Sequence, residues 1–285
     1  MDVIRAVAVL DHPKLPETVR VAGDIAAALE ERGISVFRAT TWDTPALQTI
    51  MPQVQLVVVL GGDGSTLRAA RVAAPHGVLV APVNMGRLGF LSEMTPTNWR
   101  ERLNCILDGQ YWVEERLMLR AVAQRDSTTL SEHDALNDIV VSRGTLARII
   151  RAQTYVDGGH LSTYACDGLI VATPTGSTAY ALAAGGPILP PTLKNILLVP
   201  IAPHLSLSRA VVLAQGAQVS IRVHTDHRAI LTADGQNERE LHDGDVVIVR
   251  AGEHDARFAR VQPPSYFYTT LMQRLRGEAW KDERP

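Results

Sequence analysis

The chain has 285 residues and a formal net charge of −2, from 28 basic and 30 acidic side chains. This near-neutral balance gives no general attraction to nucleic acid or to an anionic membrane, and the length suffices for one large or two medium domains. Two cysteines are too few for a disulfide framework, and no apolar run approaches membrane-spanning length. The N-terminus lacks the layout of a signal peptide, so we expect a cytoplasmic protein without nucleic-acid or membrane partners.

The first 110 residues predict alternating strands and helices. Apolar runs typical of buried strands lie at residues 5–10, 34–37, 54–60 and 77–82. Helical spacing of apolar residues predicts helices over 16–32, directly after residue 66, and from near Pro96. This alternation predicts a parallel, Rossmann-like sheet, whose ligands bind beyond the carboxyl ends of the strands.

From Tyr111 the pattern changes to many short strands separated by Gly, Pro, Asn and Asp. The expected strands span residues 113–124, 138–142, 148–156, 169–172, 196–200, 211–213, 219–224, 229–232, 246–250 and 257–261. Helical spacing appears only at 178–184 and at 266–280. We therefore expect an α/β Rossmann-like domain at residues 1–110, with 266–285 packing back on it, and an all-β sandwich domain at 111–265.

The glycine-rich stretch at residues 60–67 joins the third expected strand to a helix. Glycines let a ligand approach the backbone, and the first N–H groups of a helix lack intrahelical partners, which suits phosphate. Asp63 would repel an anion, so one interpretation is that it faces a hydroxyl or a metal. The alternative is a tight turn in which Asp63 caps the helix. The stretch has neither the Walker A lysine nor the spacing of the dinucleotide fingerprint.

A second dense stretch, residues 167–180, predicts a strand that enters a Thr-Pro-Thr-Gly turn. Ser177 or Thr178 can cap the helix that follows. A flat ring could lie against the small residues beyond, with Thr178 bonding its edge; the alternative is a tight turn packed with small residues. The pair at 137–138 and the segment at 233–236 are common turn sequences and carry no function by themselves.

Taken in order, these motifs resemble the NAD kinase family. The matching segments are residues 61–64, 84–91, 137–138, 167–168, 173–180, 185–188, 200–204 and 234–236. They extend over nearly the whole chain, and the Thr-Pro-Thr-Gly-Ser-Thr-Ala-Tyr run is highly specific, whereas lipid kinases and phosphofructokinases carry loops similar to Gly-Gly-Asp-Gly. The resemblance implies phosphoryl transfer from ATP or polyphosphate to the adenosine-ribose 2′-hydroxyl of NAD. It also implies the two-domain architecture above and a homodimer or homotetramer.

The same resemblance implies roles for individual residues. Asp63 matches the catalytic aspartate, and Asp138 stands where the family usually has glutamate. The positions that match NAD contacts are Asp63, Gly64, Asn137, Asp138, Arg148, Asp167, Thr178, Ala179, Tyr180, Ala181, Leu182, Ala183 and Gln236. Asp63 would accept the proton of the hydroxyl or orient it.

The donor phosphates are expected at the glycine-rich turn. The expected contacts are Gly62, Gly64, Ser65, Thr66 and Arg68, with Arg87 as a further candidate. We find no carboxylate cage, so Mg²⁺ or another divalent cation should arrive with the donor rather than at a dedicated protein metal site.

Two other functions remain open at this point. A lipid kinase of the diacylglycerol type would need an apolar substrate groove, and the second stretch is too polar for one. A non-catalytic NAD(P) sensor would bind the dinucleotide without forming an ATP-dependent product. The sequence also leaves open the choice between ATP and polyphosphate, the preference for NAD or NADH, the subunit number and any feedback.

Overall fold

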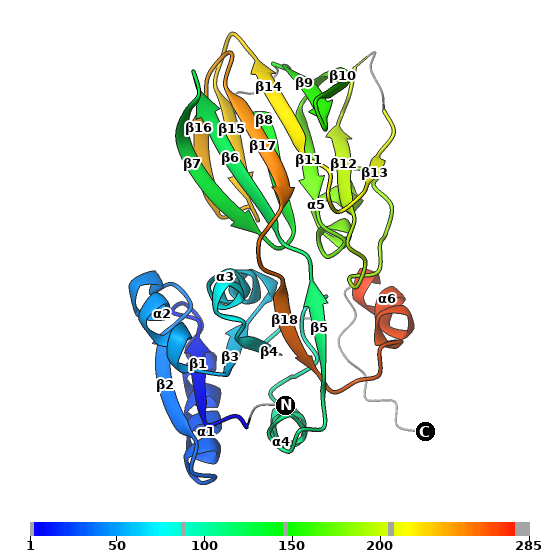
Figure 1. Cartoon of the computed structure of the whole chain (residues 1–285). Helices are drawn as coiled ribbons and strands as arrows, with labels where there is room; N and C mark the ends of the chain where they lie inside the picture. Colours follow the sequence, from blue (N-terminus) through cyan, green and yellow to red (C-terminus); the bar gives the residue numbers. More distant parts are fainter. Residues whose placement is uncertain (1–2, 87–88, 145–147, 205–207, 277–285) are drawn as a thin grey trace. The chain divides into compact units, whose positions relative to one another are not determined.

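A computed structural model describes residues 3–86, 89–144, 148–204 and 208–276. The chain divides into two compact units, one formed by Met1–Glu115 with Ala256–Pro285 and the other by Arg116–Asp255. Within the described residues there are three six-stranded sheets, one in the first unit and two in the second (Figure 1).

The first sheet has the strand order β2-β1-β3-β4-β18-β5. Its strands are β1 (Ala6–Asp11), β2 (Ser35–Thr40), β3 (Leu56–Gly61), β4 (Leu79–Asn84), β5 (Trp112–Arg116) and β18 (Ala256–Arg260). The pairs β1–β2, β1–β3, β3–β4 and β4–β18 are parallel. The prediction of a parallel α/β sheet is therefore confirmed for the five strands that these pairs join, and β3 and β4 are apolar because they are buried throughout.

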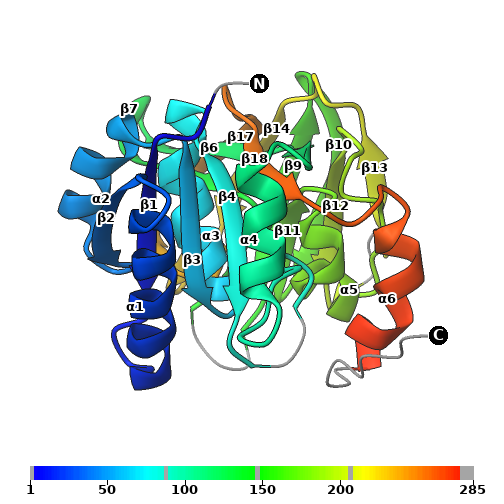
Figure 2. The same cartoon turned by 90° about the horizontal axis from the view of Figure 1, so that it is seen from below.

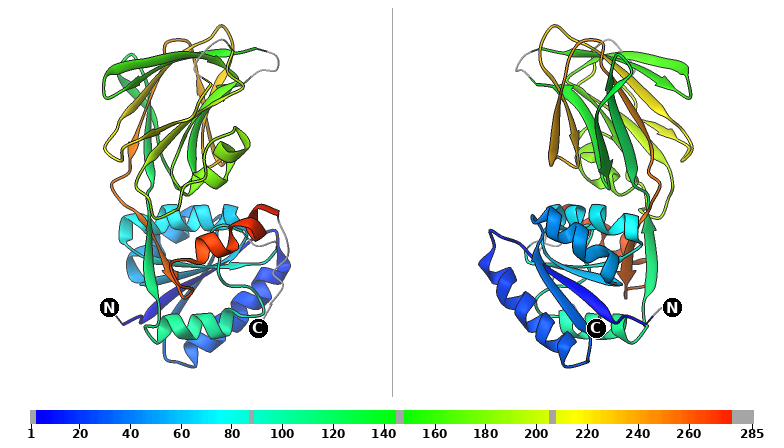
Figure 3. Two further views of the ribbon diagram at one scale, coloured as in Figure 1. Left: turned by 90° about the vertical axis from the view of Figure 1, so that its right-hand side faces the viewer. Right: turned by 60° about the vertical axis from the view of Figure 1, so that its left-hand side comes forward.

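Helices cover both faces of this sheet. The helices of the unit are α1 (Pro16–Glu30), α2 (Thr44–Ile50), α3 (Asp63–Ala73), α4 (Trp99–Leu107) and α6 (Tyr266–Arg276), with 3₁₀ turns at η1 (Met51–Gln53) and η2 (Ala74–His76). Ile25 of α1 and Leu103 of α4 share one apolar cluster with Val58 of β3. Figures 2 and 3 show α1 and α4 on this face and α3 on the opposite one.

The second unit consists of two antiparallel sheets. One has the order β10-β9-β14-β17-β6-β7 and the other β13-β12-β11-β8-β15-β16. The first contains β6 (Leu119–Arg125), β7 (Thr128–Ala135), β9 (Ile150–Val156), β10 (Gly159–Cys166), β14 (Val219–His224) and β17 (Val246–Ala251). The second contains β8 (Asp138–Arg143), β11 (Gly168–Ala172), β12 (Ile196–Ile201), β13 (Val211–Leu213), β15 (Ala229–Ala233) and β16 (Asn237–Leu241). Alternate residues of both sheets form one core, so the expected sandwich is confirmed.

Two expected strands belong elsewhere. The expected strand over 113–124 is two strands, β5 and β6, and β5 lies in the first sheet. The expected strand over 257–261 is β18, which pairs with β4 rather than with the sandwich. Local pattern alone does not distinguish these segments, because a strand of mixed polarity can pair in either sheet.

Three strands that the sequence pattern did not indicate lie at sheet edges. They are β7, β10 and β16. Edge strands carry polar residues on an exposed side and so lack the apolar alternation that marks inner strands. One helix boundary also differs from expectation, because α4 begins at Trp99 and Pro96 precedes it.

Candidate active site

The turn between β3 and α3 places Asp63 at the first position of a helix. Gly61 has φ +149°, and a Cβ there would lie 2.4 Å from Ser65 Oγ, so only glycine fits. The N-cap residue is Gly62. Asp63 Oδ2 instead accepts a hydrogen bond from the N–H of Phe90 at 3.2 Å. The helix-capping interpretation of Asp63 is therefore wrong, since its carboxylate is aligned by the segment that follows β4.

That segment closes over Asp63 at a second glycine. A Cβ at Gly89 would lie 2.2 to 2.7 Å from the carboxylate atoms of Asp63, far below ordinary contact. The chain leaving β4 is fixed by the bond from Met85 N to Gly61 O at 3.1 Å and by the bond from Asn84 N to Met94 O at 2.8 Å. The matched motif at 84–91 thus contacts the Gly-Gly-Asp-Gly turn directly, although Arg87 lies outside the described residues.

The residues expected to hold phosphate are not equally available. The N–H groups of Ser65 and Thr66 both donate to Gly62 O, at 3.1 and 3.2 Å, and both side chains are buried. Gly62 and Gly64 are exposed. Arg68 is half-buried, with its Cζ 5.4 Å from the ring centroid of Trp42. The exposed glycines are therefore the part of this turn that a ligand can approach.

The second unit contains a pocket of about 330 Å³. Its lining residues are Asn137, Asp138, Val140, Ser142, Ala179, Tyr180, Thr232, Asp234 and Gly235. Four of the residues matched to NAD contacts are among them. Val140, Ser142 and Thr232 had not been identified from sequence, yet strand periodicity contains the signal: 138, 140 and 142 share one face of β8, and Thr232 pairs with Val140 across the sheet.

Asp234 organises one wall of this pocket and was not recognised as doing so from sequence. Its Oδ1 accepts hydrogen bonds from the N–H groups of Asn137 at 2.8 Å and Asp138 at 3.3 Å, and its Oδ2 accepts one from Leu136 at 3.1 Å. Asp234 and Gly235 both have positive φ and are the central residues of a β-turn closed by the bond from Gln236 N to Ala233 O at 3.0 Å, within the three-residue connection between β15 and β16. The turn between β15 and β16 therefore holds the backbone at the start of β8.

The Thr-Pro-Thr-Gly turn is joined to the same backbone. Thr173 N donates to Asn137 O at 2.9 Å, and Thr173 Oγ1 donates to Leu136 O at 2.5 Å. A Cβ at Gly176 would lie 2.0 Å from Asn137 O, so the turn needs glycine to pack there. The two motifs at 137–138 and 173–176 form one hydrogen-bonded assembly.

Asp138 is buried in this pocket wall. Burial, reinforced by the nearby charge of Asp234, raises the pKa of Asp138 from 3.8 to about 7. A protonated carboxyl near neutral pH can donate a hydrogen bond as well as accept one.

The remaining matched residues have other surroundings. Neither Ser177 nor Thr178 caps α5 (Tyr180–Ala183), because the N-cap is Ala179 and both hydroxyls donate to carbonyls of the turn before η3 (Gly176–Thr178). Asp167 forms a two-point pair with Arg143, at 3.0 and 3.1 Å. The exposed Arg148 lies 3.3 Å from Asp226 and does not line the pocket. The N–H of Gln236 donates to Ala233 O.

Two further observations concern metal binding and membrane-spanning helices. In the described part of the chain, no group of three or more His, Cys, Asp and Glu side chains is arranged to hold a metal ion. Nor does any helix there have the length and apolar character needed to cross a lipid bilayer.

Comparison with known proteins covers both units. Residues 11–111 match the family described as the ATP-NAD kinase N-terminal domain, and residues 136–261 match the ATP-NAD kinase C-terminal domain. An NAD kinase of Chloroflexus aurantiacus is 40% identical over 273 residues, which is 96% of this chain and 99% of that one. An NAD kinase of Moorella thermoacetica is 40% identical over 295 residues, covering 100% and 93% of the two chains.

Solved structures agree with this assignment. Yeast NADH kinase complexed with NADH has a TM-score of 0.87 at 23% identity, covers 100% of this chain and 91% of its own, and supports the fold alone. An NAD kinase from Archaeoglobus fulgidus in complex with ATP has a TM-score of 0.77 at 27% identity, over 95% and 99% of the two chains. The chain therefore belongs to the NAD kinase family.

Proposed function

We propose that this chain transfers a phosphoryl group from ATP to the 2′-hydroxyl of the adenosine ribose of NAD, giving NADP. The observation that carries the proposal is the match of both units to ATP-NAD kinase domains over most of the chain. ATP is favoured as donor over polyphosphate for two reasons. Both matched families are described as ATP-NAD kinase domains, and a solved relative is in complex with ATP.

Asp63 is the group we assign to the reacting hydroxyl. A ribose hydroxyl is a poor nucleophile at neutral pH, and a carboxylate that accepts its proton or orients it assists attack on phosphorus. Two contacts fix the carboxylate: the N–H of Phe90 donates to it, and Gly89 packs directly against it. A group held in this way has little freedom to leave its productive position.

The exposed glycines Gly62 and Gly64 and the side chain of Arg68 are the proposed contacts of the donor phosphates. The N–H groups of Ser65 and Thr66 support this turn from within the helix instead. Mg²⁺ keeps several waters and binds readily to substrate phosphates, so it would reach this site mainly with the donor rather than through a dedicated set of protein ligands. The cation, carried with the donor, would neutralise the charge on the phosphates.

The pocket at β8 and the Thr-Pro-Thr-Gly turn is the proposed dinucleotide site. Asn137, Asp138 and Tyr180 line it, and Tyr180, 47% exposed, offers a ring for stacking. The proposal also keeps the other residues matched to NAD contacts, namely Gly64, Arg148, Asp167, Thr178, Ala179, Ala181, Leu182, Ala183 and Gln236. Six of the nine lining residues have a polar side chain, which suits a dinucleotide better than the acyl chains of a lipid.

The test is a coupled assay in which an NADP-specific dehydrogenase detects the product. The protein is incubated with NAD and Mg²⁺, and with ATP, polyphosphate or no donor in parallel. We expect NADP with ATP. Product with polyphosphate alone would contradict the donor assignment, and dinucleotide binding with neither donor yielding product would favour the sensor. Diacylglycerol as acceptor tests the lipid-kinase alternative, and NADH tests the acceptor preference.

We also propose a cytoplasmic homodimer or homotetramer assembled through the second unit. The two cysteines are not joined in a disulfide, which suits a reducing compartment. Light scattering coupled to size-exclusion chromatography measures the mass, and a particle of monomer mass would contradict the assembly.

A further inference from the structure

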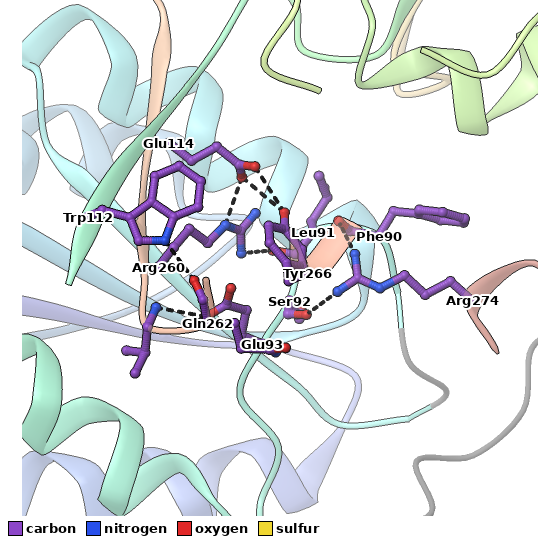
Figure 4. Close-up of polar contacts among 11 residues, drawn as sticks. Phe90, Leu91, Ser92, Glu93, Trp112, Glu114, Arg260, Gln262, Tyr266 and Arg274 are labelled. Carbon is purple, nitrogen blue, oxygen red and sulfur yellow. Dashed lines mark hydrogen bonds and ion pairs between the residues drawn. The ribbon is translucent and has the colours of Figure 1, made fainter. Parts of the chain in front are cut away.

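Two buried arginines hold three consecutive carbonyls of the segment that contacts Asp63. Arg274 of α6 donates from Nη1 to Phe90 O at 3.0 Å and from Nη2 to Ser92 O at 3.4 Å. Arg260 of β18 donates from Nη1 to Leu91 O at 2.8 Å. Figure 4 shows the two guanidinium groups beside this short stretch of backbone. Buried carbonyls need donors, and here side chains from the C-terminal part of the chain supply them.

These arginines are themselves fixed. Arg260 Nε lies 2.7 Å from Glu114 Oε2, and both side chains are 1% exposed. The hydroxyl of Tyr266, the first residue of α6, donates to Glu114 at 3.0 Å. Burial lowers the pKa of Arg260, but Tyr266, Glu114 and Glu93 together outweigh it and raise the pKa, so the guanidinium stays charged.

The last residue of the segment is bound by the chain directly after β18. Glu93 Oε2 accepts hydrogen bonds from the N–H groups of Val261 at 3.0 Å and Gln262 at 3.3 Å. The segment is therefore attached to the C-terminal part of the chain at four successive residues, 90 to 93. This explains physically why α6 returns to the first unit.

Phe90 connects this network to the proposed catalytic group. Its C=O accepts from Arg274 and its N–H donates to Asp63, so the two bonds act on neighbouring peptide groups. Arg274 Cζ also lies 5.8 Å from the centroid of the Phe90 ring. Fixing the carbonyl restricts the rotation of the chain at Phe90 and so restricts where its N–H can point.

We propose that Arg274 is a positioning residue for phosphoryl transfer: it holds the Phe90 backbone so that its N–H keeps the Asp63 carboxylate aimed at the reacting hydroxyl. The inference rests on the proposed function, and it assigns to the C-terminal helix a role that none of the matched motifs carries. Arginine suits this role better than lysine, because its planar fork reaches two carbonyls at once.

The experiment compares Arg274→Gln, Arg274→Lys and the charge-matched control Arg20→Gln, whose side chain is 76% exposed on α1. We expect Arg274→Gln to lower kcat by about tenfold or more, the effect of misplacing a catalytic group by a fraction of an ångström, with KM for NAD within about twofold. Arg274→Lys should recover part of the loss because it restores one donor, and the control should match wild type.

A double-mutant cycle separates positioning from general destabilisation. If Arg274 acts through Asp63, then Arg274→Gln added to Asp63→Asn costs little further activity, because coupled residues are not additive. Equal losses in both backgrounds, or wild-type kcat in Arg274→Gln, would overturn the proposal. If Arg274→Gln does not fold, the milder Arg274→Lys takes its place in the same cycle: it should lower kcat in the wild-type background and cost little further activity beside Asp63→Asn, and equal losses in both backgrounds would overturn the proposal.

Failure of the proposed function is distinguishable from failure of this inference. If the wild-type protein forms no NADP with either donor, the function fails. Hydrogen exchange at the Phe90 amide then judges the contact itself: we expect faster exchange in Arg274→Gln than in wild type and in Arg20→Gln, and unchanged exchange would overturn the inference.

Discussion

Gly89 offers the sharpest perturbation of the proposed catalytic group that leaves the group itself in place. A Cβ at this position would lie 2.2 Å from Asp63 Oδ1 and 2.6 Å from its Cγ. In Gly89→Ala the carboxylate or the segment must therefore move by about 1 Å to regain ordinary contact, and a displacement of that size can cost about 10²-fold in rate. We expect kcat to fall by about two orders of magnitude.

The assay is NADP formation at saturating ATP and NAD, with thermal unfolding measured in parallel. The matched control is Gly23→Ala, a glycine in the interior of α1 with no atom within 4 Å of an added Cβ. That control should keep wild-type kcat and gain about 0.5–1 kcal/mol of stability, since alanine favours helix. A Gly89→Ala enzyme with kcat within twofold of wild type would refute the close packing of Gly89 on Asp63 as a determinant of rate.

The pocket of the second unit gives three further predictions. The pKa of Asp138 is raised to about 7 in the folded chain, whereas the unfolded chain releases this proton near pH 4. Between these two pH values the folded state binds the extra proton, so the free energy of unfolding falls as pH rises from about 4 to 7. Asp138→Asn should remove this fall in the free energy of unfolding, which is on the order of 4 kcal/mol over three pH units. Denaturant titrations at several pH values measure it, and an unchanged pH dependence would contradict the raised pKa of Asp138. Asp234→Ala leaves the N–H groups of Leu136 and Asn137 without this acceptor, which should cost about 1–3 kcal/mol of stability for each N–H left unsatisfied. Because the pocket wall then loses its fixed position, we expect KM for NAD to rise about tenfold or more, and an unaltered KM would contradict the role given to Asp234. Gly176→Ala places a Cβ 2.0 Å from Asn137 O and should weaken NAD binding in calorimetry; wild-type affinity would show that the turn does not shape the pocket.

Much of the fold follows from local chemistry. Buried parallel strands such as β3 and β4 are continuous apolar runs, and Gly33, which ends the turn after α1, has the positive φ that glycine adopts freely. The edge strands β7 and β16 escape this kind of reasoning because solvent, not the core, selects their side chains. The assignment of β18 to the first sheet is set by long-range pairing with β4, which local pattern does not encode.

In the candidate site, too, some features follow from local sequence and others depend on long-range contacts. Asp63 and the Thr-Pro-Thr-Gly turn were identified from motifs, because glycine and hydroxyl residues at fixed spacing mark special backbone. The role of Asp234 depends on three backbone N–H groups about a hundred residues away in sequence, and it becomes visible only once β8 and β15 are paired. Arg274 has no motif around it; its importance comes from the carbonyls that the fold brings to it.

The most direct test of the central claim is the turnover of Asp63→Asn, which keeps the shape of the side chain and removes its ability to take a proton. We expect kcat to fall by about 10²–10⁴ with NAD affinity largely retained, while Asp24→Asn, an exposed aspartate on α1, behaves as wild type. An Asp63→Asn enzyme that forms NADP from ATP and NAD at close to the wild-type rate would contradict the catalytic role of this carboxylate.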